Sequence, residues 1–242
     1  MGKLSMNKHI SGQFTAELED IRNRVLAMGG LVARQLEQAL DALGSLDAEL
    51  AQQVIQGDRQ VNTLEVAIDE ECTRIIAKRQ PAASDLRLII AISKTITDLE
   101  RIGDSSVRIA KAAVEKRNQN QQPLLVSIES MGRHATRTLN ATLDALARMD
   151  AAAALALHKQ DAKLDKEYEG IIRQLMTYMM EDPRSIPGVL DVLWAARAVE
   201  RVGDRCKNIC EYIIYYVNGK DVRHSSYEDM ARGVEPPRSE ES

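Results

Sequence analysis

Residues 18–44 read LEDIRNRVLAMGGLVARQLEQALDALG, and this stretch decides the fold. Its apolar side chains recur every three or four positions, at Leu18, Ile21, Val25, Met28, Val32, Leu36, Ala39 and Leu43. An α-helix turns once in about 3.6 residues, so this spacing places them along one face of a long helix. Such a stripe is buried against neighbouring helices. The stretch therefore predicts one member of a helical bundle.

The next two segments repeat this pattern. One apolar stripe runs from Leu50 to Ile75 and another from Ile89 to Ala113. The breaks between them carry the expected signals, with Asp47 and Ser84 as candidate N-caps and Pro81 as a stop. The first half of the chain therefore predicts three long helices.

The second half of the chain repeats the first half. A shift of 103 residues places Met28-Gly29 on Met131-Gly132, and Leu40-Asp41-Ala42-Leu43 on Leu143-Asp144-Ala145-Leu146. After the turn near residue 80 the shift becomes 100, which is a length change that a surface turn tolerates. The duplication predicts an all-α fold of six long helices, arranged as two tandem antiparallel three-helix bundles.

Composition sets the domain boundaries that we expect. Residues 1–10 form an N-terminal segment, 11–118 the first bundle and 121–219 the second bundle, separated by a polar run. Residues 220–242 are polar and end in a proline- and glutamate-rich sequence, which predicts a poorly ordered tail.

Charge and composition also exclude classes of protein. Aromatic residues make up only 3% of the 242, which argues against a β-sandwich or barrel. The net charge of −4 argues against nucleic acid as the main partner. No apolar run is long enough to span a membrane, and no secretory signal is apparent, so we expect a cytoplasmic protein. Three cysteines are too few for a disulfide framework.

The sharpest repeated motif is Glu-Arg-(Ile/Val)-Gly-Asp. It places Glu100 and Asp104 four residues apart on one face of the third helix, and Glu200 and Asp204 on one face of the sixth. Each copy has a mid-helix glycine, which is unfavourable by about 0.5–1 kcal/mol relative to alanine. We therefore expect a close approach by another group at Gly103 and Gly203.

The preceding helices carry matching oxygen ligands. Asp58 and Asn62 precede the turn near residue 80 by about as many residues as Glu100 and Asp104 follow it, so an antiparallel hairpin brings them to similar heights. Asp161 and Asp165 stand in the same relation to the second motif. Carboxylate and amide oxygens suit hard or borderline cations. The pattern predicts one metal site in each repeat.

Other interpretations remain open at this point. A Glu/Asp pair on a helix is commonly a solvated face, with neighbours such as Arg101 and Arg108 forming exposed ion pairs. A carboxylate-bridged metalloenzyme or a metal-storing bundle is also compatible, although no Glu-x-x-His motif is present. Cys206 and Cys210 share a helix face without a partner pair, which favours core packing over a zinc site.

Several stretches resemble the PhoU family, over about residues 9–223 of the chain. These are the two Glu-Arg-(Ile/Val)-Gly-Asp motifs, Met28-Gly29, and the segments 78–87, 168–171 and 174–182. The doubled motif is the most specific of them. The resemblance is to the enterobacterial type of the family.

The resemblance implies a regulator of phosphate homeostasis and not an enzyme. It implies an adaptor that dampens the phosphate-starvation response, bridging the ATPase subunit of a phosphate ABC transporter and a phosphate sensor histidine kinase. It also implies a homodimer that reaches the inner membrane through its partners, and metal ions (Mg, Mn, Fe, Zn or Ca) on the acidic motifs. Asn62 departs from the carboxylate expected after Asp58, so ligation in the first repeat should differ.

Overall fold

The computed structural model describes the backbone of residues 2–114 and 122–234, and the side chains of residues 12–114 and 125–234. These ranges are built from α-helices, one short 3-10 turn and connecting turns, without a β-strand among them. The elements are α1 (Gly2–Ser45), α2 (Ala48–Arg79), α3 (Ala83–Val114), α4 (Gln122–Arg148), α5 (Ala151–Glu181), η2 (Pro183–Ser185), α6 (Ile186–Asn218) and α7 (Tyr227–Val234).

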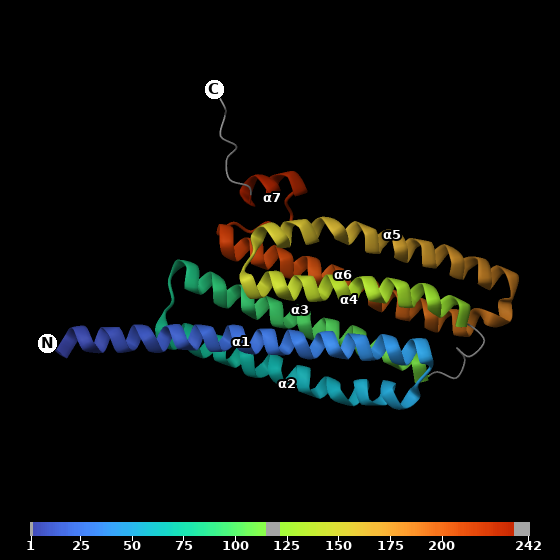
Figure 1. Cartoon of the computed structure of the whole chain (residues 1–242), viewed down its shortest axis with the longest axis horizontal. Helices are drawn as coiled ribbons and strands as arrows, with labels where there is room; N and C mark the ends of the chain where they lie inside the picture. Colours follow the sequence, from blue (N-terminus) through green and yellow to red (C-terminus); the bar gives the residue numbers. More distant parts are fainter. Residues whose placement is uncertain (1, 115–121, 235–242) are drawn as a thin grey trace, which may run out of the picture.

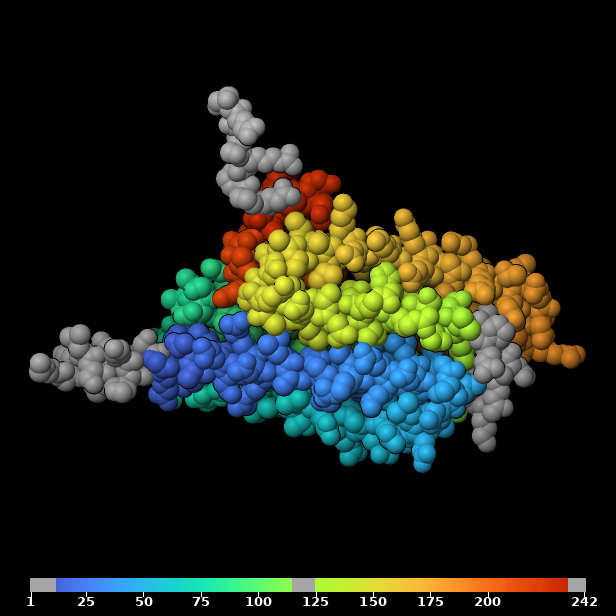
Figure 2. All heavy atoms as spheres, in the orientation of Figure 1, coloured from blue at the N-terminus to red at the C-terminus, as the bar shows by residue number. Residues whose placement is uncertain are grey.

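The six long helices form two three-helix bundles that lie against each other (Figure 1). Helices α1, α2 and α3 make the first bundle, and α4, α5 and α6 make the second. Between the bundles, α3 packs against α6 at the centre and α1 packs against α4 along the face seen in Figure 2. The predicted all-α fold with two duplicated bundles is confirmed.

The apolar stripes predicted from the sequence form the core. Ile21, Met28, Leu36, Ile68 and Leu99 are all completely buried. Because each helix turns such a stripe inward, the core runs along the whole length of both bundles.

Helix ends follow local chemistry, with one difference from expectation. Asp47 caps α2, since its carboxylate accepts the backbone N–H groups of Glu49 and Leu50 at 2.9 and 3.0 Å. Gln80, just before Pro81, ends α2 in the left-handed conformation. The expected cap at Ser84 is wrong: α3 already begins at Ala83, which places Ser84 inside its first turn.

The chain ends differ from the expected boundaries. The expected segment 1–10 is not set apart, because α1 runs unbroken from Gly2. The expectation of a poorly ordered tail after 220 is wrong for 227–234, which form α7. Apolar anchors explain the difference, since Val222 and Met230 are buried within an otherwise polar stretch. The expected bundle boundary at 118–121 and the last eight residues lie outside the described ranges.

The contact between α1 and α4 is reciprocal. A Cβ built at Gly29 would lie 2.4 Å from Leu143 Cδ2, and one built at Gly132 would lie 2.3 Å from Leu40 Cδ2. Gly29 and Gly132 are equivalent in the duplication, and so are Leu40 and Leu143. Each bundle thus inserts the same leucine into the same glycine notch of the other bundle, and this lets the two backbones approach closely.

A buried carboxylate joins α3 to α6. Asp98 is only 2% exposed, and it accepts hydrogen bonds from Tyr212 Oη at 2.9 Å and from Arg205 Nη1 and Asn208 Nδ2 at 3.3 Å. Burial and the neighbouring Asp98 raise the pKa of the Tyr212 hydroxyl above its usual range, which keeps it a donor. Asp98 therefore connects the two bundles through polar contacts at the centre of the molecule.

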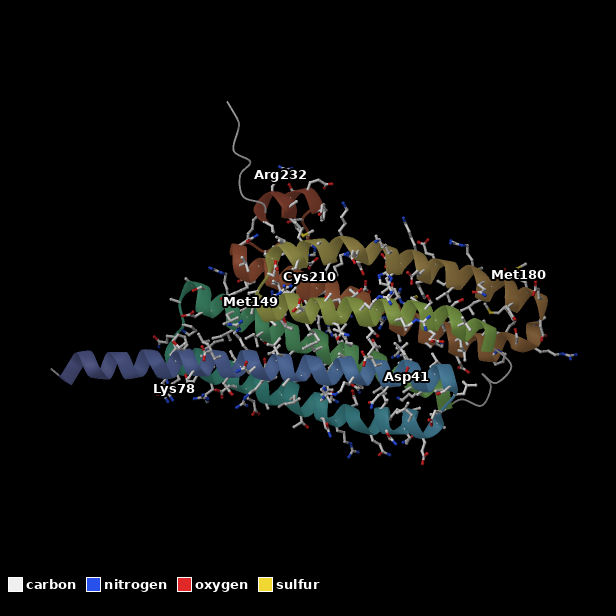
Figure 3. All side chains as sticks on the ribbon, in the orientation of Figure 1. Asp41, Lys78, Met149, Met180, Cys210 and Arg232 are labelled. Atoms are coloured by element: carbon white, nitrogen blue, oxygen red, sulfur yellow. The ribbon has the colours of Figure 1, made fainter. Side chains whose placement is uncertain are left out.

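The cysteines belong to the core, as the sequence predicted. Cys206 and Cys210 are buried and form no disulfide. Burial raises the pKa of the Cys210 thiol to about 12, so it stays protonated at neutral pH. Figure 3 shows Cys210 within the second bundle, whereas Met180 lies at the far end of α5, 82% exposed. None of the described helices is long and apolar enough to cross a membrane.

Candidate functional site

The repeated acidic motifs lie midway along α3 and α6, and their glycines allow close helix contact. A Cβ built at Gly103 would lie 3.2 Å from Asp58 Oδ1, and one built at Gly203 would lie 3.0 Å from Asp161 Oδ1. The expected close approach is confirmed in both bundles. A larger residue at Gly103 would push Asp58 away from the motif, and one at Gly203 would meet Leu164 Cδ2, at 2.5 Å, as well as Asp161.

The first acidic cluster comprises Asp58, Asn62, Glu65, Glu100 and Asp104. Its centre is Asp58, which accepts hydrogen bonds from Gln35 Nε2 at 3.0 Å and from Asn62 Nδ2 at 3.3 Å. Gln35 comes from α1 and is 5% exposed, and its Oε1 atom has no hydrogen-bond partner among the described residues. Two helices therefore supply the oxygen atoms of this cluster, and α1 contacts it through Gln35.

The charges of the first acidic cluster interact. Burial raises the pKa of the Glu100 carboxyl, and the neighbouring Asp104, Glu65 and Asp58 raise it further, while Arg101 lowers it. Each carboxylate makes ionisation of the next less favourable. A cation placed among them would relieve this repulsion.

The second acidic cluster comprises Asp161, Asp165, Glu200 and Asp204, and it is more deeply buried. Lys207 Nζ lies 3.4 Å from Asp161 Oδ2, and Arg197 Nη1 donates to Glu200 Oε1 at 2.5 Å. Glu200 is 8% exposed, and its second oxygen, Oε2, has no hydrogen-bond partner among the described residues. A buried carboxylate oxygen without a partner is unfavourable unless a cation or a proton joins it.

The pKa values of the second cluster shift in the same direction. Burial raises the pKa of the Asp161 carboxyl, Lys207 opposes this, and Asp165 and Asp204 add to it. Burial also raises the pKa of the Glu200 carboxyl, with Asp204 as the largest charged contributor. Among the described residues, the four carboxyl groups of the cluster thus have two basic contacts, Lys207 and Arg197.

The structure brings each predicted set of residues within electrostatic range, across two adjacent helices. Within the described side chains, however, no three carboxylate, imidazole or thiol groups are grouped closely enough to hold a metal ion as they stand. The donor chemistry suits a hard cation, because both clusters offer oxygen ligands, each with a buried oxygen that lacks a partner. Asn62, Asp104 and Asp165 are exposed and can adjust to a ligand.

Three contacts of the clusters were not predicted. Gln35, Arg197 and Lys207 each hold an acidic residue of a cluster. Gln35 directly precedes Leu36 of the apolar stripe, and this flanking position was the only signal in the sequence. Arg197 and Lys207 look like ordinary surface residues until the packing of α6 is known.

Comparison with protein families then identifies the fold and its repeats. The family model of the PhoU domain matches twice, over residues 25–113 and 128–213, and each match contains one acidic cluster. The chain belongs to the PhoU family. The two matched segments correspond to the two bundles, which confirms the resemblance carried by the doubled motif.

Curated relatives and solved structures of the family agree. The phosphate-specific transport system accessory protein PhoU of Escherichia coli (strain K12) is 59% identical over 95% of both chains. The homolog from Pseudomonas aeruginosa is 49% identical over 99% of this chain and 100% of its own. The crystal structure of PhoU from P. aeruginosa superposes with a TM-score of 0.79, covering 86% of this chain and 100% of its own.

A more distant family member keeps the same architecture. The phosphate transport system regulatory protein PhoU from Streptococcus pneumoniae is 32% identical and superposes with a TM-score of 0.80. That match covers 86% of this chain and 99% of the other. The PhoU-family fold is therefore retained across large differences in sequence.

Proposed function

We propose that this PhoU-family chain is a negative regulator of the phosphate-starvation response and a modulator of phosphate uptake. The observation that carries the proposal is the 59% identity, over 95% of both chains, to a protein named as an accessory of the phosphate-specific transport system. Such similarity over the full fold supports a shared role in phosphate transport.

In this proposal the chain acts as an adaptor, without catalysis of its own. It would join the ATPase subunit of a phosphate ABC transporter to a phosphate sensor histidine kinase on the cytoplasmic side of the inner membrane, as a homodimer. Long rigid bundles offer extended helix faces for such docking. The names of the relatives, which describe accessory and regulatory proteins, support this choice over a metalloenzyme or a metal store.

Deleting the gene is expected to derepress phosphate-uptake genes in phosphate-rich medium, because the signal that silences the kinase would be lost. Transcript levels of these genes, measured with and without a plasmid copy of the wild-type chain, check this. In phosphate-poor medium the deletion and parent strains should show equal expression. Unchanged expression in rich medium would refute the regulatory role.

The adaptor part of the proposal has its own test. The full chain, used as bait in cells grown in high phosphate, should retain both the kinase and the transporter ATPase. If the bait retains only one of the two proteins, the chain does not bridge them. If it retains neither, direct docking is refuted.

We further propose that each acidic cluster binds a metal ion. Glu100, Asp104, Asp58 and Asn62 would hold it in the first bundle, and Glu200, Asp204, Asp161 and Asp165 in the second. The buried oxygens without partners and the raised pKa values support this, since a cation would offset both the desolvation and the repulsion. When bound, the metal would supply positive charge that holds two helices of a bundle together.

Asp104→Ala and Asp204→Ala are each expected to abolish metal binding in one bundle, and the double variant in both. Elemental analysis of protein purified without chelator measures this. Asp41→Ala with Asp144→Ala is a matched control, because these aspartates are also equivalent in the duplication but lie outside the clusters. Equal metal in wild type and in the Asp104/Asp204 double variant would contradict the proposal.

A further inference from the structure

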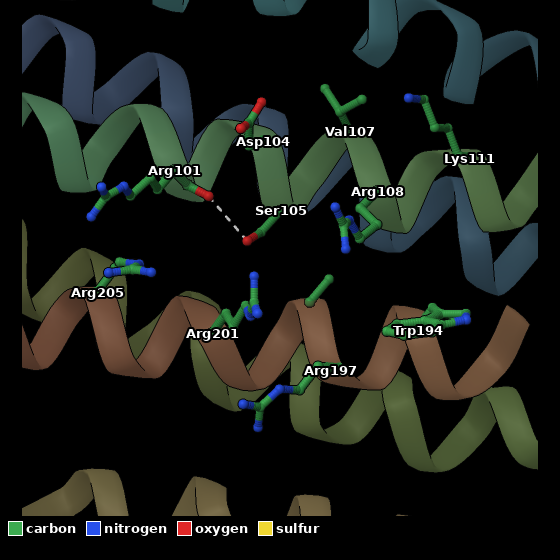
Figure 4. A pocket seen from close by; sticks show the side chains of 11 residues that line it. Arg101, Asp104, Ser105, Val107, Arg108, Lys111, Trp194, Arg197, Arg201 and Arg205 are labelled. Carbon is green, nitrogen blue, oxygen red and sulfur yellow. Dashed lines mark hydrogen bonds between the residues drawn. The ribbon is translucent and has the colours of Figure 1, made fainter. Parts of the chain in front are cut away.

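A second charged site, of opposite sign, lies between the bundles. A pocket of about 300 Å³ opens where α3 passes α6, and its walls carry six basic side chains: Arg101, Arg108, Lys111, Arg197, Arg201 and Arg205. In Figure 4, the guanidinium groups of Arg101, Arg108, Arg201 and Arg205 occupy the gap between the two helices, with the Ser105 hydroxyl between them. Among the described residues that line the pocket, Asp104 is the one acid, and its side chain points away from α6.

The two repeats contribute to this pocket symmetrically. Arg101 and Arg201 are the arginines of the two Glu-Arg-(Ile/Val)-Gly-Asp motifs, and they lie on opposite walls. Each motif therefore directs its acids into its own bundle and its arginine into the gap between the bundles.

The positive charge of the pocket is only partly balanced. Arg205 and Arg101 share Asp98, at 3.3 and 4.0 Å, and Arg197 pairs with Glu200. Among the described residues, Arg108, Lys111 and Arg201 have no ion-pair partner. Like charges gathered in one pocket repel, and an anion placed among them would relieve this repulsion.

The chemistry of the walls points to phosphate groups. Guanidinium groups bind phosphate oxygens with paired hydrogen bonds, and the positive charge of four of them is greater than one phosphate dianion balances. Trp194, 56% exposed, adds an aromatic face at one end of the pocket. We propose that the α3–α6 pocket binds a small anion with two or more phosphate groups, held by Arg101, Arg108, Arg201 and Arg205.

Trp194 makes the site directly measurable, because it is the only tryptophan in the chain. Titration with tripolyphosphate, at constant ionic strength and in EDTA, should change its fluorescence saturably. EDTA excludes binding through a metal on the acidic clusters. The inference does not rest on the proposed regulatory role, since the isolated chain is tested without partners.

Arg101→Gln combined with Arg201→Gln is expected to weaken tripolyphosphate binding at least tenfold. Arg59→Gln combined with Arg137→Gln removes the same charge from exposed positions on α2 and α4, and should change binding less than twofold. Arg108→Gln, at the other end of the pocket, gives an independent single variant, and circular dichroism verifies folding. No saturable change in wild type, or equal weakening in both double variants, would overturn the proposal.

Further ligands test which part of the anion the pocket recognises. Inorganic phosphate should bind more weakly than tripolyphosphate, and equal affinity would overturn the inference that several phosphate groups are held. Calorimetry with ATP tests whether the pocket recognises a nucleotide or a phosphate chain without a base. If ATP binds more tightly than tripolyphosphate, the pocket also holds the base, stacked on Trp194. If the two bind equally, the pocket recognises the phosphate chain alone.

Discussion

Asp98→Ala is expected to lower the free energy of unfolding by about 3 kcal/mol, since removing one partner from a buried polar network leaves the other partners unpaired. For a chain of this size this corresponds to a decrease of roughly 6–12 °C in Tm. Three donors from α6 lose their acceptor in this variant, and Tyr212 is the closest of them at 2.9 Å. Thermal unfolding followed by circular dichroism measures the change.

Control variants separate the loss of the Asp98 hydrogen bonds from the effect of removing any aspartate. Asp41→Ala removes an aspartate whose side chain is exposed on α1, and should change the stability by less than about 0.5 kcal/mol. Tyr212→Phe combined with Asp98→Ala should destabilise by less than the sum of the single changes, because the two groups share one interaction. Wild-type stability in Asp98→Ala would show that the link between α3 and α6 is energetically unimportant.

Gly132→Leu is expected to destabilise the protein by about 2–3 kcal/mol through overpacking. Three atoms of Leu40 lie close to a Cβ built at this position: Cδ2 at 2.3 Å, Cδ1 at 2.9 Å and Cγ at 3.1 Å. Leu40 is only 7% exposed, so turning it aside would press it against neighbouring core side chains, and either the leucine or the helices must shift. Chemical unfolding of the purified variant measures the loss.

Gly170→Leu is the matched control, because Gly170 lies within α5 with nothing within 4 Å of a built Cβ. There the better helix propensity of leucine should raise the stability slightly. Leu40→Ala should also rescue part of the loss in Gly132→Leu, since it removes the group that blocks the notch. Equal effects of Gly132→Leu and Gly170→Leu would contradict the interlocked contact.

The sequence predicted contacts within each bundle well, because helix length and turn position determine which residues lie at the same height. Asp58 and Glu100 were placed in one cluster on this basis, and in the structure Asp58 is one of the carboxylates that raise the pKa of Glu100. The glycine of the motif was predicted to permit close approach, and Gly103 does so. Periodicity alone also identified the buried face of each long helix.

Contacts between the bundles could not be predicted, because the apolar stripes do not determine how one bundle is rotated relative to the other. Asp98 appeared as one polar residue among many, and only the packing of α6 supplies its donors. Arg101 appeared in the sequence only as a neighbour that forms exposed ion pairs in the solvated-face alternative; it is exposed and 4.0 Å from Asp98, and it also lines the gap beside α6. The apolar anchors that order α7 were missed because the average composition around Met230 is polar.

The reciprocal insertion of Leu40 and Leu143 has an evolutionary meaning. A contact made twice, by equivalent residues in both directions, is what two identical subunits form when they associate around a twofold axis. A half-length ancestor could therefore have paired with itself through this surface before its gene was doubled and fused. Fusion then freed each half to change separately, and Asp98, whose counterpart in the second half is Ala198, records one such divergence.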